Sequence, residues 1–325
     1  MSTIPLEPAT QASAPADAQL TTEDEAALTA LFADWDKLAA QKDIVPPMSP
    51  LTSQLLSLDL NDPQATLLLT KIIETDPVLT ARILGLANSA ALARAGKPVC
   101  EVLAAVMRLG ADPTFEAVFT QLAALWLRDA SQLPEQGQLH DLWLEYLISA
   151  FCARELAAAV DEVEIKPSVA YAAGLLHDVG TLALCFAQPE PMSRLLGSAY
   201  AIGTPLYGQF VDAHTNLGAA LLQRWRTPQQ LVAVASRHHA GFAPEESALT
   251  GIVFLADHLH QKILAHECGS FQRAVTTQLG CFGGATHETA AALLGLGLTD
   301  RLDEIIARVA SESQRIDALA AAVPG

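Results

Sequence analysis

Charged side chains are scarce in this 325-residue chain, since Asp, Glu, Lys and Arg together make up 17% of it. The 19 Lys and Arg residues are outnumbered by 36 Asp and Glu residues, which gives a formal net charge of −17. A basic surface for nucleic acid is therefore excluded for the chain as a whole, and broad attraction to an acidic membrane surface is excluded on the same ground. The acidity favours solubility or a basic partner, and it does not specify a fold.

Cysteine pairs, a signal peptide and a long apolar run are also lacking. The five cysteines are scattered, and no two of them form a Cys-x-x-Cys pair, which is typical of reduced thiols. The first residues, MSTIPLEPATQASAPADAQ, contain neither a cationic nor an apolar region. Charges interrupt the apolar stretches before the roughly 20 residues that a membrane span needs. We therefore expect a cytoplasmic protein with no membrane partner.

The pattern of a β-sheet is sparse as well, because few segments alternate apolar and polar residues. From Leu51 onward, apolar residues recur at helical spacing, and 51% of the chain is hydrophobic, enough for a substantial core. The predicted fold class is all-α. A solenoid is not expected, since no repeat of fixed period occurs.

Several helix ends can be placed from local signals. Thr22 is a candidate N-cap for a helix that runs to the Pro-rich stretch IVPPMSP. Asp76 followed by Pro77 predicts a helix start, and Gly110 predicts a helix end. Asn88 is expected to cap a helix, with a place in a cleft as the alternative.

Composition divides the chain into four predicted parts. Residues 1–20 are rich in Pro, Ala, Ser and Thr and are expected to be a disordered tail. An N-terminal helix and linker follow over 21–45, and the main helical body covers 46–265. Residues 266–325 are expected to form a C-terminal extension of two helices separated by GLGLTD.

Histidine and aspartate gather in the second half of the chain in a way that predicts a metal site. The candidate ligands in this region are His177, Asp178, His214, His238, His239 and Asp257. Imidazole and carboxylate together suit Fe, Mn, Ni or Zn. Gly180 is consistent with a helix end beside the His177–Asp178 pair. The plainer interpretation stays open: each histidine could be packed in the core or favour a helix C-terminus, and Asp257 could be exposed.

Four segments, in this order, resemble the HDOD domain, the HD-related output domain of bacterial signalling proteins. They are IIETDPVLTARILGLANSA, VLAAVMRLG, YAAGLLHDVGTLAL and HTNLGAALLQRWRTPQQLVAVASRHH. The resemblance covers about residues 46–260. It implies a multi-helical HD-like domain preceded by a smaller N-terminal helical lobe. The lobe would span about 46–135 and the HD-like part about 136–265.

The resemblance also implies ligands for one metal. HD phosphohydrolases and HD-GYP phosphodiesterases place a first histidine, a His-Asp pair and a later aspartate around the ion. His177 and Asp178 match the central pair, and Asp257 matches the last aspartate. Where the first histidine should stand, this chain has Glu145. Further ligands could come from the remaining histidines of the group, His214, His238 and His239.

Two functions follow from these observations. HDOD domains are generally regarded as output or scaffold domains, so we expect a non-catalytic signalling module with a degenerate HD-type metal site and a protein or nucleotide partner. The alternative is a metal-dependent phosphohydrolase or cyclic-dinucleotide phosphodiesterase. Against it, the chain lacks a Gly-rich phosphate loop, and the His pair is followed by AGFAPEESALTG instead of a GYP segment.

Overall fold

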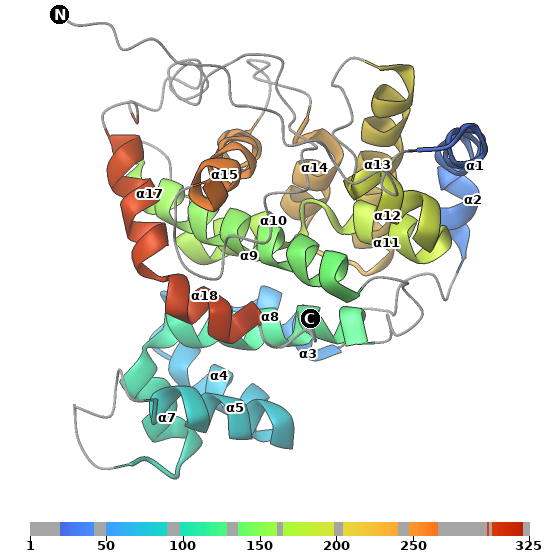
Figure 1. The fold of residues 1–325 in the computed structure, drawn as a ribbon. Helices are drawn as coiled ribbons and strands as arrows, with labels where there is room; N and C mark the ends of the chain where they lie inside the picture. The colour runs from blue at the N-terminus through green and yellow to red at the C-terminus, as the bar shows by residue number, and fades with distance from the viewer. Residues whose placement is uncertain are drawn as a thin grey trace, which may run out of the picture.

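A computed structural model describes most of the chain, and its regular elements are helices (Figure 1). The described residues are 20–41, 50–89, 98–128, 136–160, 165–197, 204–239, 247–265, 298 and 301–320. Within these ranges there is no strand, so the predicted all-α fold class is confirmed. The predicted tail lies outside them except for Leu20, and the division into lobes stays a prediction.

The described helices form four groups along the chain. The N-terminal pair is α1 (Thr22–Ala33) and α2 (Trp35–Ala40). The next group is α3 (Pro50–Leu56), α4 (Ala65–Glu74), α5 (Pro77–Ala87), α7 (Val102–Leu109) and α8 (Ala111–Arg128). The largest group is α9 (Gln136–Ala159), α10 (Pro167–Leu176), α11 (Val179–Ala187), α12 (Pro189–Gly197), α13 (Pro205–Arg224), α14 (Gln229–Arg237) and α15 (Ala248–Ala265). Two C-terminal helices, α17 (Leu302–Ser311) and α18 (Ser313–Ala320), complete the described part.

Local signals in the sequence predicted the ends of α5 and α7 correctly. The Asp76 carboxylate accepts hydrogen bonds from the backbone of Val78 at 2.7 Å and Leu79 at 3.1 Å, so it caps α5 as predicted. Gly110 ends α7 with a φ of 90°, a conformation that costs glycine little. Asn88 caps α5, and its side-chain amide exchanges two hydrogen bonds with the backbone of Val99, at 2.8 and 2.9 Å.

The prediction for the first helix was wrong in two details. The N-cap is Thr21 and not Thr22, because Thr21 and Asp24 form a reciprocal capping box. The two adjacent threonines are equivalent by propensity, and each is followed by an acid three residues later, Asp24 or Glu25, so the sequence alone does not separate them. The expected single helix also breaks at Asp34, which is the C-cap of α1 and the N-cap of α2.

The helix α10 is central to the fold and packs against α8, α9, α14 and α15. A Cβ added at Gly174 would lie 2.8 Å from the Ala150 Cα, so the backbones of α10 and α9 are in contact. Trp143 and Trp225 are buried, as expected of core anchors. The stretch Pro167–Ala187 is long and apolar enough to cross a membrane, but 83% of its apolar window is buried inside the fold. It is therefore a core segment, broken between α10 and α11.

The helix α11 approaches α13 even more closely. A Cβ at Gly180 would lie 1.9 Å from the carbonyl oxygen of His214 and 2.8 Å from the nitrogen of Gly218. A helix does end beside the His177–Asp178 pair, since His177 is the C-cap of α10, but Gly180 is not part of that end and lies in the first turn of α11. The glycine is required by the packing of two backbones.

The C-terminal helices are held by a partly buried network of charges. Arg154 on α9 donates to Glu116 on α8 at 3.0 Å and also to Glu155 and Glu312. Arg315 donates to Glu312 at 2.9 Å and to Glu116. The second predicted C-terminal helix is split at Glu312 into α17 and α18, and the first lies outside the described residues. The network joins α17 and α18 to α8 and α9.

We predict that Gly180→Ala lowers the free energy of unfolding by about 3 kcal/mol or more, because a methyl group has no room between α11 and α13. Urea unfolding measures the effect. Gly208→Ala is the matched control, since a Cβ there meets nothing within 4 Å and α13 should gain about 0.5–1 kcal/mol. Equal effects of the two substitutions would contradict this packing.

A second prediction concerns the ion pair that holds α1. Arg194 donates to both carboxylate oxygens of Asp24, at 2.9 and 2.6 Å, and holds the Asp24 pKa well below its ordinary 3.8. We expect Asp24→Asn to lower the free energy of unfolding by about 1 kcal/mol at pH 7, a modest value because Arg194 is partly exposed. A depressed folded pKa contributes stability above the unfolded pKa, so the difference from the wild type should shrink as pH falls below about 4.

Urea unfolding at pH 7, 5, 4 and 3 checks this. Asp36→Asn on exposed α2 serves as the control and should change stability by less than about 0.5 kcal/mol. A difference between wild type and Asp24→Asn that stays constant over the whole pH range would count against the ion pair.

Candidate metal centre

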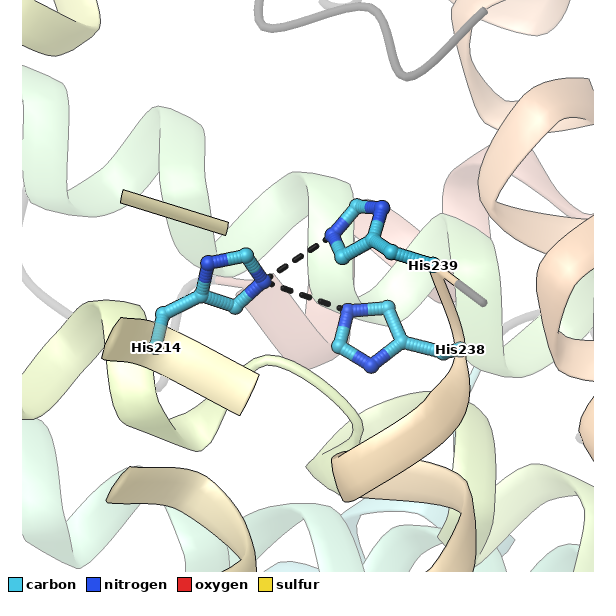
Figure 2. A group of neighbouring side chains, drawn as sticks. All are labelled: His214, His238 and His239. Atoms are coloured by element: carbon cyan, nitrogen blue, oxygen red, sulfur yellow. Dashed lines mark hydrogen bonds between the residues drawn. The ribbon is translucent and has the colours of Figure 1, made fainter. Parts of the chain in front are cut away.

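Four histidines meet where α10 and α14 end and α13 passes. His177 follows the last turn of α10, His214 lies in the middle of α13, and His238 and His239 follow α14. His177, His214 and His238 are 3%, 1% and 2% exposed, so their imidazoles lie in the core. Figure 2 shows the rings of His214, His238 and His239 pointing toward one another.

Backbone carbonyls fix the orientation of three of these rings. His177 Nδ1 donates to the Gly174 oxygen at 2.7 Å, and His214 Nδ1 donates to the Phe210 oxygen at 2.8 Å. His238 Nδ1 donates in the same way to the Ala235 oxygen at 3.0 Å. A carbonyl only accepts, so in the neutral ring Nδ1 carries the hydrogen and Nε2 carries the lone pair. Metal-ligating histidines are oriented by the same kind of bond.

The Nε2 atoms of the group lie close together. His214 Nε2 is 2.9 Å from His239 Nε2 and 3.4 Å from His238 Nε2 (Figure 2). Ligand atoms of these three histidines all lie within 4.8 Å of one another. Bonds of about 2.1 Å to one ion put two nitrogens about 3.0 Å apart at a right angle and about 3.4 Å apart at a tetrahedral angle. The separations therefore fit ligands that share one cation.

Asp178 brings a carboxylate to the same histidines. Its Oδ1 is 3.3 Å from His214 Nε2 and 3.9 Å from His238 Nε2. Thr181 donates its hydroxyl to this oxygen at 2.9 Å, and the Tyr146 hydroxyl donates to the Asp178 backbone oxygen at 2.9 Å. The two hydroxyls hold the turn between α10 and α11 so that Asp178 faces α13.

A second set of candidate ligands adjoins the first, because the ring centroids of His177 and His238 are 4.9 Å apart. His177 Nε2 is 3.4 Å from Asp257 Oδ1, and the Asp257 side chain on α15 is 15% exposed. Glu145 on α9 belongs to the same region, because Asp257 and Asp178 both raise its pKa in addition to burial. Its buried Oε1 has no hydrogen-bond partner among the described residues. A buried acceptor without a hydrogen-bond donor requires an explanation, and a cation bound beside the carboxylate would supply one.

Burial decides the charge of the imidazoles. It is the largest cause that lowers the pKa of His238 to about 3, helped by the nearby His177 and His214. The pKa values of His214 and His239 are also lowered, again mainly by burial. The pKa of His177 is raised because its bond to Asp257 and the carboxylate charges outweigh the burial. At neutral pH the three histidines around His214 are therefore neutral, the form that binds metal.

The structure thus brings together every candidate ligand named from the sequence. His214, His238, His239 and Asp178 form one set, and His177, Asp257 and Glu145 form the other. Of the plainer interpretation, the packing of His238 in the core is observed, whereas Asp257 is largely covered and not exposed. Their role as ligands stays a prediction.

Sequence reasoning missed the two hydroxyls that hold Asp178. Thr181 stands three residues after Asp178, a spacing at which a side chain reaches back across the first turn of a helix. This signal was present in the sequence. Tyr146 is 32 residues away along the chain and lies on another helix, so no local pattern announces it.

The donor set fits a divalent cation. Four imidazoles, two aspartates and a buried glutamate are nitrogen and oxygen ligands, and the Glu145 Oε1 atom has no hydrogen-bond partner among the described residues. Such a mixed set suits Fe, Mn, Ni or Zn, whereas Mg²⁺ and Ca²⁺ prefer oxygen alone.

Solved structures share this fold. A protein from Marinobacter aquaeolei VT8 assigned to signal transduction has a TM-score of 0.65 and 22% identity, over 91% of this chain and 66% of that one. An HDOD domain protein of unknown function from Geobacter sulfurreducens has a TM-score of 0.59 and 24% identity, and the match covers 87% of this chain and 97% of that one. A protein from Shewanella amazonensis SB2B assigned as a phosphohydrolase has a TM-score of 0.59 and 19% identity, and the match covers 91% of this chain and 98% of that one.

Sequence comparison gives the family. The chain is 28% identical over 222 residues to an uncharacterized protein of Treponema pallidum (strain Nichols). The alignment covers 65% of this chain and 41% of that protein, so it spans less than half of the relative's length. The model of the HDOD domain matches residues 45–241, more than half of the chain. The protein therefore belongs to the HDOD domain family.

Proposed function

We propose that this protein is a non-catalytic signalling output module that binds a divalent cation at the histidine cluster and a signalling protein at its surface. The observation that carries the proposal is the convergence of His214, His238 and His239 on one point, with Asp178 beside them. A cytoplasmic location remains part of the proposal.

The two sets of ligands differ in chemistry. The set around His214 is rich in imidazole, which suits Zn, Fe or Ni. The set around His177 adds two carboxylates, from Asp257 and Glu145, which suit Mn or Fe. The Asp178 carboxylate is close enough to affect both sets, since its charge acts on His214 of the first and on His177 and Glu145 of the second.

The charges around the cluster argue against hydrolysis of phosphate esters. A divalent ion would supply Lewis acidity toward a phosphoryl oxygen. The largest electrostatic contributions to the pKa values of Glu145, His214 and His239 come from aspartates and other histidines, with no Lys or Arg among them. Phosphoryl transfer needs cationic groups to balance the phosphate charge. Three carboxylates around one ion instead repel an anionic substrate, and the same repulsion favours a protein partner over a nucleotide.

Exposed apolar side chains support a protein partner. The described residues include five large hydrophobic side chains that are exposed, and all of them belong to α4, α5 and α7: Leu67, Leu68, Val78, Leu103 and Met107. Met107 is 71% exposed. Exposed apolar side chains gathered in one part of a molecule are typical of protein interaction sites.

We predict that the purified protein binds Zn²⁺ and that His214→Ala weakens the binding at least 10-fold, because His214 Nε2 contacts Asp178 and both other histidines of its set. Isothermal titration calorimetry on protein prepared without a metal-affinity step measures the affinity. His140→Ala is the matched control, since His140 lies near the start of α9 and outside the cluster. Equal affinities for the two variants would contradict the proposed site.

We also predict negligible hydrolysis of cyclic dinucleotides, nucleoside phosphates and bis(4-nitrophenyl) phosphate with added Mn²⁺, Fe²⁺ or Ni²⁺. The expected rate equals that of the His177→Ala variant, because the carboxylates disfavour an anionic substrate. Metal-dependent turnover of about 1 s⁻¹ that His177→Ala abolishes would overturn the non-catalytic role. Glu145→His then shows whether the acid alone limits activity: a gain in turnover assigns the defect to Glu145.

A further inference from the structure

The N-terminal arm, residues 20–41, lies outside the segment that matches the HDOD family and packs on an unexpected part of the fold. Its helices α1 and α2 both contact α13, and α1 also contacts α12. In Figure 1 the arm lies at the right of the molecule beside α12 and α13, far from α3, which follows it in sequence. The arm therefore covers the helix that carries His214.

A short chain of contacts leads from the arm to His214. The ring of Phe32 on α1 lies 5.8 Å from the ring of Phe210 on α13, centroid to centroid. The Phe210 ring in turn lies 4.6 Å from the His214 imidazole, at an interplanar angle of 32°. The Phe210 carbonyl also accepts the Nδ1 hydrogen of His214 at 2.8 Å. Phe210 therefore holds His214 by its ring and by its backbone, and Phe32 holds Phe210.

Polar contacts fasten the arm at both ends. Arg194 on α12 binds the Asp24 carboxylate in α1 through two hydrogen bonds. At the other end, Arg224 on α13 donates to the backbone oxygens of Ala39 at 2.9 Å and Gln41 at 2.7 Å, where α2 ends. Phe32 lies between these two polar contacts along the arm and is 3% exposed.

We propose that the arm is a positioning element for the cation site, with Phe32 acting through Phe210 to hold the His214 imidazole in its ligating orientation. The inference rests on the proposed function, because it needs a cation at the cluster. It adds that the site is complete only when a segment outside the family-matched region is docked.

The geometry of the cluster explains why the contact between Phe32 and Phe210, which touches no ligand nitrogen, affects cation binding. The His214 Nε2 atom is 2.9 to 3.4 Å from its neighbours in the cluster, so a displacement of α13 by a fraction of an ångström separates the ligands. Removal of the Phe32 ring leaves a cavity beside Phe210 that α13 and its side chains partly fill. Because coupling between two equilibria is reciprocal, a bound cation must also strengthen the docking of the arm.

The test compares Zn²⁺ affinities by calorimetry for four forms of the full chain. Phe32→Ala should bind Zn²⁺ about 10-fold to 100-fold more weakly than the wild type, as loss of an orienting group does at other metal sites. Phe32→Leu keeps an apolar contact and should stay within about 3-fold of the wild type. Leu69→Ala is the matched control, a fully buried residue of α4, which packs against α5, α7 and α8, and it should leave the affinity unchanged.

Two further measurements do not depend on a cavity. Asp24→Asn loosens the arm without removing packing and should weaken Zn²⁺ binding in the same direction. Amide hydrogen exchange in residues 22–40 should slow when Zn²⁺ is added to the wild type, and this slowing should disappear in His214→Ala.

The results separate the inference from the proposed function. If His214→Ala weakens Zn²⁺ binding while Phe32→Ala and Asp24→Asn bind like the wild type, the cation site stands and the positioning role of the arm is overturned. If Leu69→Ala weakens binding as much as Phe32→Ala, general loss of stability explains the effect and the inference also fails. Absence of Zn²⁺ binding in the wild type overturns both.

Discussion

The candidate metal centre depends on the contact between the backbones of α11 and α13. Gly180 leaves no space for a side chain against the His214 carbonyl, and this closeness brings Asp178, two residues earlier, to within 3.3 Å of His214 Nε2. The Tyr146 hydroxyl then fixes the intervening turn through the Asp178 carbonyl. The ligands are placed by packed helices and by the turns that end them, and their positions are therefore as rigid as the core itself.

Burial gives the centre its electrostatic character. It is the largest cause that keeps His214, His238 and His239 neutral, and it is also the largest cause that raises the pKa of Glu145. A region with neutral imidazoles and carboxylates in a poorly solvated environment attracts a cation strongly and disfavours an anion. Binding of a cation and exclusion of a phosphate ester thus have the same physical origin in this molecule.

The parts of the fold that the sequence predicts correctly are those with a local cause. Asp76 and Pro77 start a helix and Gly110 ends one because a cap needs only its own few residues. Gly180 was misread, because its reason is the passing backbone of α13, 34 residues away from it at His214.

The site shows the same boundary between local and distant causes. His177, Asp178 and Asp257 could be proposed from the gathering of histidine and aspartate in the second half of the chain, and the resemblance to a family added Glu145. Other features of the site involve side chains on different helices. These features are the grouping of the ligands into two sets, the oxygen of Glu145 that is unpaired among the described residues and the hydrogen bond of the Tyr146 hydroxyl. Such relations depend on how helices pack, and the spacing of residues along one helix does not contain them.

The charge network around Arg154 has a consequence for how this molecule is divided. Arg154 and Glu116 lie inside the segment that matches the family, but Glu312 and Arg315, which complete their hydrogen bonds, lie about 70 residues beyond its end. Excision at residue 241 would strip buried charges of their partners and uncover the face of α9 on which α17 and α18 pack. The set of helices that pack together in this structure is therefore larger than the segment that matches the family.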